Sequence, residues 1–136
     1  MKKVPIQKLK GVTKELHAKL TEHRIEDNEK FFNLALTPQG REELAVKLGL
    51  THEAVLELAN RADLARLKGV AGVYSDLLED AGVDTVKELA NRNPENLHAK
   101  LLEINTQMQL TKAPPSLKHV EGWVRSAKRR RKFLQY

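Results

Sequence analysis

The tetrapeptide Leu-Lys-Gly-Val occurs twice, at residues 9–12 and 67–70, and this repetition constrains the fold more than any other feature of the sequence. Each copy lies between stretches with helical spacing of apolar residues, and glycine can take the positive φ that a tight turn between helices requires. At the same offset Leu20 matches Leu78. The chain is therefore predicted to contain two copies of one helical unit.

Capping residues and prolines indicate where the helices of each unit begin and end. Four helices are expected in each half: residues 13–23, a short helix after Asp27, residues 38–49, residues 51–67, residues 70–81, a short helix capped by Thr85, a helix opened by Asn93-Pro94, and a helix capped by Ser116 that runs into residues 128–132. Leu44, Val46 and Leu48 are assigned to the apolar face of the third helix. No useful run of alternating apolar residues is present, so the sequence predicts an all-α fold in one compact domain.

Charge is distributed unevenly along the 136 residues, although the formal net charge is only +6. Residues 1–14 carry +5, residues 15–111 carry −6 and residues 112–136 carry +7. An acidic body with basic ends suggests a polyanionic partner that meets the ends, whereas terminal basic runs can also be solvated tails. Residues 128–136 are assigned to a basic C-terminal tail, and both interpretations are left open for its charge cluster at residues 128–132.

Patterns that would indicate an enzyme are missing from the sequence. The chain has no cysteine, and its five histidines form no i, i+4 pair, so neither a metal site nor a disulfide is expected. No phosphate-binding loop and no nucleophile elbow is present. The sequence also lacks a signal peptide and a run of about 20 apolar residues. We expect a non-enzymatic cytoplasmic protein without cofactor or membrane partner.

Residues 43–58 have the spacing of a DNA-reading helix-turn-helix, because a small Ala45, a turn at Gly49 and an apolar Val55 would let two helices cross closely. A recognition helix here would present His52, Glu53 and Glu57 to the major groove. Phosphates repel glutamate, so this stretch is interpreted as helix packing rather than as a base-reading site.

Several conspicuous side chains are assigned structural roles. Tyr74 and Trp123 lie on apolar helical faces and are expected to anchor the core rather than stack on bases. Asn60, Arg61 and Asp63 stand at the end of a long helix before the second glycine turn, and are expected to brace the junction between the halves.

Six segments between residues 60 and 124 carry a resemblance to a known family: residues 60–64, 67–70, 74–78, 81–89, 92–97 and 120–124. They closely resemble a bacterial domain-of-unknown-function family built from tandem helix-hairpin-helix repeats. The resemblance implies a first helix-hairpin-helix-like unit at residues 1–66 and a second at residues 67–127. The wider superfamily binds the DNA or RNA backbone, with hairpin N–H groups and the next helix N-terminus directed at a phosphate.

The hairpins depart from the family pattern at their third position, where glycine is usual. The first hairpin has Thr13 and the second has Ala71, and a β-branched Thr crowds an approaching phosphate. The candidate nucleic-acid-binding residues are the two hairpins and the basic end: Lys10, Gly11, Val12, Thr13, Lys14, Lys68, Gly69, Val70, Ala71, Gly72, Arg125, Lys128, Arg129, Arg130, Arg131 and Lys132.

Two functions remain open from the sequence. The first is a module that contacts the nucleic-acid phosphate backbone without base specificity. The second is a protein-interaction or scaffold domain that retains the repeat fold but has lost phosphate binding, as the degenerate hairpins and the acidic body suggest. Fold similarity alone does not decide between them.

Overall fold

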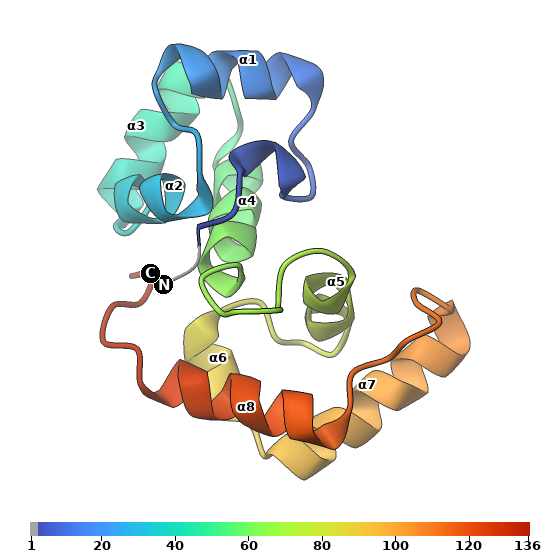
Figure 1. Ribbon diagram of the computed structural model, residues 1–136. Coiled ribbons are helices and arrows are strands. Elements are labelled where there is room, and N and C mark those ends of the chain that lie inside the picture. The colour runs from blue at the N-terminus through green and yellow to red at the C-terminus, as the bar shows by residue number, and fades with distance from the viewer. Residues whose placement is uncertain (1–2) are drawn as a thin grey trace.

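A computed structural model describes residues 3–136, and within them the chain is built from helices and turns without a β-strand (Figure 1). The predicted all-α fold is confirmed. The elements are η1 (Ile6–Lys8), α1 (Lys14–Glu22), α2 (Asn28–Leu34), α3 (Pro38–Leu48), α4 (His52–Leu64), α5 (Val73–Asp80), α6 (Val86–Ala90), α7 (Pro94–Met108) and α8 (Leu117–Lys128).

Side-chain caps fix the beginnings of most helices. In each case the cap accepts a hydrogen bond from the backbone N–H three residues further on, which satisfies a donor that the helix leaves free. The capping residues are Thr13, Asp27, Thr37, Thr51, Thr85, Asn93 and Ser116. The exception is α5, which begins after Gly72 and has no side-chain cap.

Two predicted helices are shorter in the structure, because consecutive turns occupy residues 65–72. Helix α4 ends at Leu64 rather than at residue 67, and α5 begins at Val73 rather than at residue 70.

The prediction for Val46 is also wrong, since its side chain is 81% exposed. Val46 lies two residues from both Leu44 and Leu48, which is half a helical turn away from the buried face.

The duplicated tetrapeptide forms the same turn twice. The N–H of Val12 donates to the carbonyl of Leu9 at 3.3 Å, and the N–H of Val70 donates to the carbonyl of Leu67 at 3.2 Å. Gly11 and Gly69 have φ of +93° and +83° at equivalent places. A side chain at either position would strain the backbone, which explains the glycine in both copies.

A second pair of turns repeats at the same offset of 58 residues. After α1, Arg24 has φ of 60°, and after α5, Gly82 has φ of 85°. The next residue, Ile25 or Val83, donates its N–H to the carbonyl five residues earlier, at 2.8 Å in both halves. The internal repeat is thus visible in the backbone and not only in the residue types.

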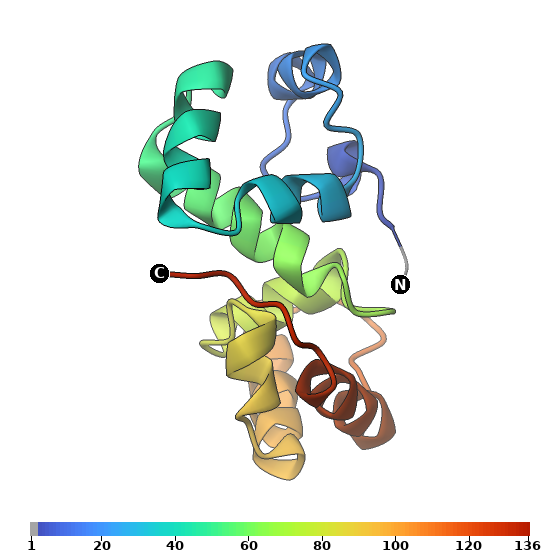
Figure 2. The same cartoon turned by 90° about the vertical axis from the view of Figure 1, so that its left-hand side faces the viewer.

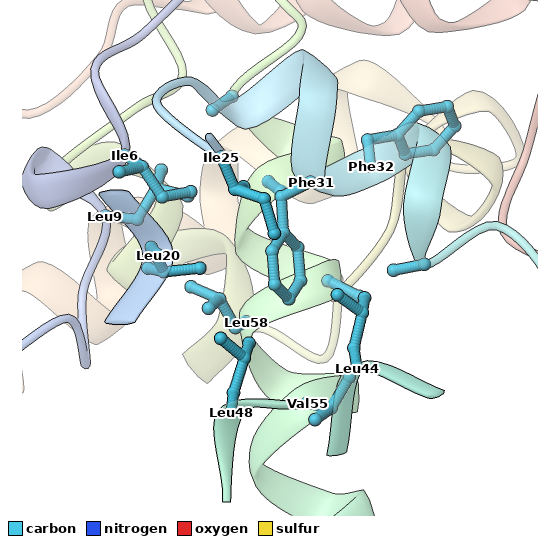
Figure 3. Close-up of a cluster of buried hydrophobic side chains, with 14 of the residues drawn as sticks. Ile6, Leu9, Leu20, Ile25, Phe31, Phe32, Leu44, Leu48, Val55 and Leu58 are labelled. Carbon is cyan, nitrogen blue, oxygen red and sulfur yellow. The ribbon is translucent and has the colours of Figure 1, made fainter. Parts of the chain in front are cut away.

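The core consists of two clusters of buried side chains, one in each half. The first gathers η1 and α1 to α4, with Phe31 at its centre (Figure 3). The second gathers α5 to α8 and includes Trp123, whose ring lies 5.4 Å from the half-buried ring of Tyr74. The clusters meet at the end of α4, where Ala65 belongs to the first and Leu64 to the second.

Figure 2 shows this division from the side. The blue and cyan helices of the first half lie above, the yellow, orange and red helices of the second half lie below, and the green α4 runs between them. The red C-terminal segment leaves α8 and returns to the first half. Leu134 is only 4% exposed within the first cluster, and the N–H of Gln135 donates to the carbonyl of Leu36 at 2.8 Å. The chain beyond residue 132 is therefore held against the first half by Leu134 and by the backbone of Gln135.

Two helical glycines predict opposite effects of the same substitution. A Cβ on Gly40 in α3 would overlap the carbonyl oxygen of Leu34, whereas a Cβ on Gly122 in α8 would meet only Arg125 Nη2, at 3.9 Å. We expect Gly40→Ala to lower the free energy of unfolding by about 1–3 kcal/mol because backbone must move. Gly122→Ala should raise it by about 0.5–1 kcal/mol, since Ala favours the helix and the space is free. Urea unfolding of both variants measures this, and equal effects would contradict it.

Candidate nucleic-acid interface

Residues of the two predicted hairpins, far apart in the sequence, line a common cavity of about 240 Å³. Its walls come from the end of η1 and the first turn, from α4, and from the start of α5. The lining residues are Lys8, Leu9, Lys10, Arg61, Ala71, Gly72, Val73, Ser75 and Asp76. The fold therefore brings together parts of both predicted hairpins.

The first hairpin presents an exposed basic edge. Lys8, Lys10 and Lys14 are all exposed, and the Lys10 side chain is 64% accessible. Its Nζ lies 3.5 Å from Asp76 Oδ1, across the cavity on α5. Thr13 faces solvent, and its hydroxyl accepts the N–H of Leu16 at 3.1 Å. The hydroxyl thus already occupies one of the donors at the N-terminus of α1 that a phosphate would use.

The second hairpin has an exposed tip and a buried base. Lys68 and Gly69 are exposed, while Val70 is fully buried in the second cluster. Gly72 then takes φ of +79° to start α5, and its carbonyl accepts the Ser75 hydroxyl at 2.7 Å. Ala71 is half-buried against the first cluster, so it contributes packing between the halves.

Arg61 braces the junction behind the cavity, as expected from the sequence. Its side chain is 4% exposed, and Nη1 donates to Ser75 Oγ at 2.9 Å and to Asp76 Oδ1 at 2.5 Å. Nη2 forms an ion pair with Glu79. All three partners are on α5, so this guanidinium fixes α5 against α4 and sets the distance between the hairpins.

Asp63 forms a second, deeper brace. Its carboxylate is fully buried and accepts the Arg66 guanidinium on Oδ1 and the Val86 N–H on Oδ2, at 2.9 Å. The Arg66 guanidinium also lies 3.8 Å from the centre of the Phe32 ring. Burial raises the pKa of the Asp63 carboxyl above its usual value, although the Arg66 charge and the Val86 N–H oppose this shift. Asp63 thereby connects the end of α4 to the start of α6.

The basic C-terminal residues lie apart from the hairpin cavity. In Figure 1 the C-terminal segment lies to the left of α4 and α5 lies to its right. Arg130 donates to the carbonyl of Arg66 at 3.2 Å, and Lys132 Nζ lies 3.4 Å from Asn33 Oδ1. The exposed cations of this region are Arg125, Lys128, Arg129, Arg131 and Lys132. The structure therefore brings the two hairpins together but places the basic end elsewhere.

The stretch with helix-turn-helix spacing packs as interpreted from the sequence. Ala45 and Val55 are buried in the first cluster, and Gly49 ends α3 in the left-handed conformation with φ of 65°. His52 and Glu53 are exposed at the start of α4. Glu53 also lines a groove of about 190 Å³ with three other carboxylates, Glu57, Glu79 and Asp84.

Two side chains, one at the cavity and one beneath the C-terminal segment, were not among the candidate site residues. Lys8 lines the cavity beside Lys10, and its position two residues earlier in the sequence is a signal that could have indicated it. Arg41 is buried and donates to the carbonyls of Ala35 and Gln135. Nothing local in the sequence indicates that partnership, because the second carbonyl lies 94 residues away.

Residues 3–136 contain no group of three or more His, Asp or Glu side chains placed to hold a metal ion. Within the same residues, no helix is long and apolar enough to cross a membrane.

A comparison with known families tests the family to which the sequence was assigned by resemblance. The family model described as a domain of unknown function (DUF4332) matches residues 10–130. The chain belongs to this family. The DUF4332 match includes Gly11, Gly69 and all helices from α1 to α8. Comparisons with curated proteins and with solved structures gave no significant match. Membership in DUF4332 carries no function, and the interpretation of its units as helix-hairpin-helix repeats stays a prediction.

Proposed function

We propose that this chain is a non-enzymatic nucleic-acid-binding module, in which two helix-hairpin-helix-like units dock on a phosphate backbone without reading base sequence. The observation that carries the proposal is a cavity lined by Leu9 and Lys10 of the first hairpin and by Ala71 and Gly72 of the second, with Lys8 beside them. Two nearby hairpins can contact successive phosphates, whereas one hairpin alone would not fix the orientation of a duplex.

Charge supports this choice of surface. Lys8, Lys10, Lys14 and Lys68 are exposed on or beside the two turns. Exposed lysines can neutralise phosphates with little conformational change, and the released counterions favour binding at low salt. The cations of the C-terminal segment form a second basic region that can strengthen binding to a long duplex from another side.

The test is binding of the full chain to labelled random-sequence duplex DNA and duplex RNA across a salt series. The hairpin variant replaces Lys8, Lys10, Lys14 and Lys68 with Gln. The control variant replaces four exposed lysines elsewhere, Lys30, Lys47, Lys87 and Lys100, with Gln. Both variants change the net charge by the same amount, so only the location of the charge differs.

We expect the hairpin variant to bind with much lower affinity than the wild type. The slope of log K against log salt should also become shallower by about 0.9 for each phosphate that the protein no longer neutralises. The control variant should keep the slope. Equal reductions of affinity in the two variants would attribute binding to net charge alone and contradict the assignment of the surface.

The basic C-terminal segment is best tested by substitution rather than by truncation, because Leu134 belongs to the first core cluster. Replacing Lys128, Arg129 and Arg131 with Gln removes exposed cations and leaves the packed residues in place. A loss of affinity confined to this variant would assign nucleic-acid binding to the C-terminal segment instead of the hairpins.

A protein-interaction domain is the alternative function. Two observations support it: the capping of α1 by Thr13 in the first hairpin, and the groove lined by four carboxylates. Thr13 already occupies a donor of α1, and the groove of Glu53, Glu57, Glu79 and Asp84 would suit a basic partner. Absence of binding to DNA and RNA at low salt would favour this alternative.

A further inference from the structure

Asp76 lies where the two hairpins meet. It is on α5 directly after the second hairpin, and it lines the shared cavity together with Lys8 and Lys10 from the first. A single oxygen, Oδ1, accepts Arg61 Nη1 at 2.5 Å and lies 3.5 Å from Lys10 Nζ. The carboxylate therefore lies where an anion bound between the hairpins would contact the same cations.

The buried guanidinium of Arg61 does not depend on Asp76 alone for its neutralisation. Arg61 also forms an ion pair with Glu79 and donates to Ser75, so it keeps two partners on α5 without Asp76. Lys10, in contrast, forms its ion pair with Asp76 while most of its side chain remains accessible. The Lys10 pair is thus an exposed contact of the kind that contributes little to stability and exchanges readily with solvent ions.

We propose that Asp76 is an internal competitor for the phosphate-binding lysine of the first hairpin, so that a nucleic-acid phosphate binds the cavity only by displacing the carboxylate from Lys10. This inference rests on the proposed function. It assigns one phosphate group to the cavity between the hairpins. The Asp76 carboxylate on α5 then lowers the affinity for that phosphate.

The test is a double-mutant cycle on duplex-DNA affinity, using the full chain at low salt. Asp76→Asn removes the competing charge but keeps an oxygen that can accept Arg61. The matched control is Asp80→Asn, which removes the same charge from an exposed position on the same helix that forms no ion pair among the described residues. Both substitutions are then repeated in the Lys10→Gln background.

We expect Asp76→Asn to tighten binding about two- to fivefold, the range that corresponds to releasing one exposed ion pair. Asp80→Asn should tighten binding less than Asp76→Asn does, because Asp80 forms no ion pair with a cation of the cavity among the described residues. In the Lys10→Gln background, Asp76→Asn should change the affinity by less than about 1.5-fold, because the carboxylate then has no lysine to release. Such a loss of the effect is the coupling that a double-mutant cycle measures.

Equal tightening by the two Asn variants, or persistence of the Asp76→Asn effect without Lys10, would overturn the inference while leaving the proposed function intact. Absence of DNA binding by the wild type and by every variant would overturn both. If Asp76→Asn fails to fold, Lys10→Gln and Lys14→Gln decide instead. Lys10→Gln should then weaken binding less than Lys14→Gln, and an equal or larger loss of affinity would overturn the inference.

Discussion

Asp63→Ala is expected to lower the free energy of unfolding by about 3–5 kcal/mol, the range for breaking a buried ion pair by removing one partner. The substitution leaves the buried Arg66 guanidinium without its carboxylate and the Val86 N–H without its acceptor. The connection between α4 and α6 would weaken, because Asp63 is on α4 and accepts the backbone N–H at the start of α6. Urea unfolding followed by circular dichroism measures the change in stability.

Asp80→Ala is the control for this experiment, because it removes a carboxylate from an exposed site on α5. Surface substitutions of this kind usually change stability by no more than about 0.5 kcal/mol. A destabilisation below about 1 kcal/mol for Asp63→Ala would show that water replaces the carboxylate, and would contradict the assignment of a buried brace.

The raised pKa of Asp63 predicts how its contribution depends on pH. A folded-state pKa above the usual 3.8 means that, between these two values, the folded chain binds more protons than the unfolded chain. Stability relative to an Asp63→Asn variant, which does not titrate at this position, should therefore increase as the pH falls through this window. A relative stability that decreases on acidification would show that Arg66 dominates and lowers the pKa.

Deletion of residues 133–136 is the second change with a large expected effect, at about 3–5 kcal/mol. The deletion removes the buried Leu134 side chain, which typically costs at least about 2 kcal/mol in a core. It also removes the Gln135 carbonyl that accepts the buried Arg41 guanidinium at 2.5 Å, and an unsatisfied charged donor costs a further 1–3 kcal/mol or so. Thermal unfolding of the full chain and the deletion variant measures the effect.

Gln135→Ala serves as the control for the deletion. The Gln135 side chain is exposed, whereas its bonds to Leu36 and Arg41 come from the backbone and survive the substitution. We expect a change of about 0.5 kcal/mol or less for this variant. A deletion variant as stable as the control would mean that residues 133–136 contribute no packing.

Local sequence signals were sufficient for the number and order of the helices, although not for the ends of α4 and α5. Caps such as Asp27 and Ser116 fall where predicted, because a side-chain oxygen three residues before a free N–H is a local property. The glycines at positions 11 and 69 were assigned to turns for the same reason. The apolar face of α3 was misassigned at Val46, since hydrophobicity alone does not establish burial.

Long-range polar partners could not be predicted. Asn28 is fully buried, accepts the N–H of Val4 and donates to the carbonyl of Ala62, yet its neighbours in the sequence indicate only a helix start. The pairing of Lys10 with Asp76 joins residues 66 positions apart. Such contacts depend on how the two units are oriented, and the orientation follows from the summed packing of both cores.

The sequence by itself determined the helical class, the internal repeat and the two glycine turns, because these follow from periodicity, capping and backbone freedom within a few residues. Only the tertiary structure decided that parts of both hairpins line one cavity, that Asp76 lies between Lys10 and Arg61, and that the basic C-terminal segment packs on the first half away from this cavity. These features depend on the relative placement of α4 and α5, which the buried Arg61 fixes through partners 14 to 18 residues further along the chain.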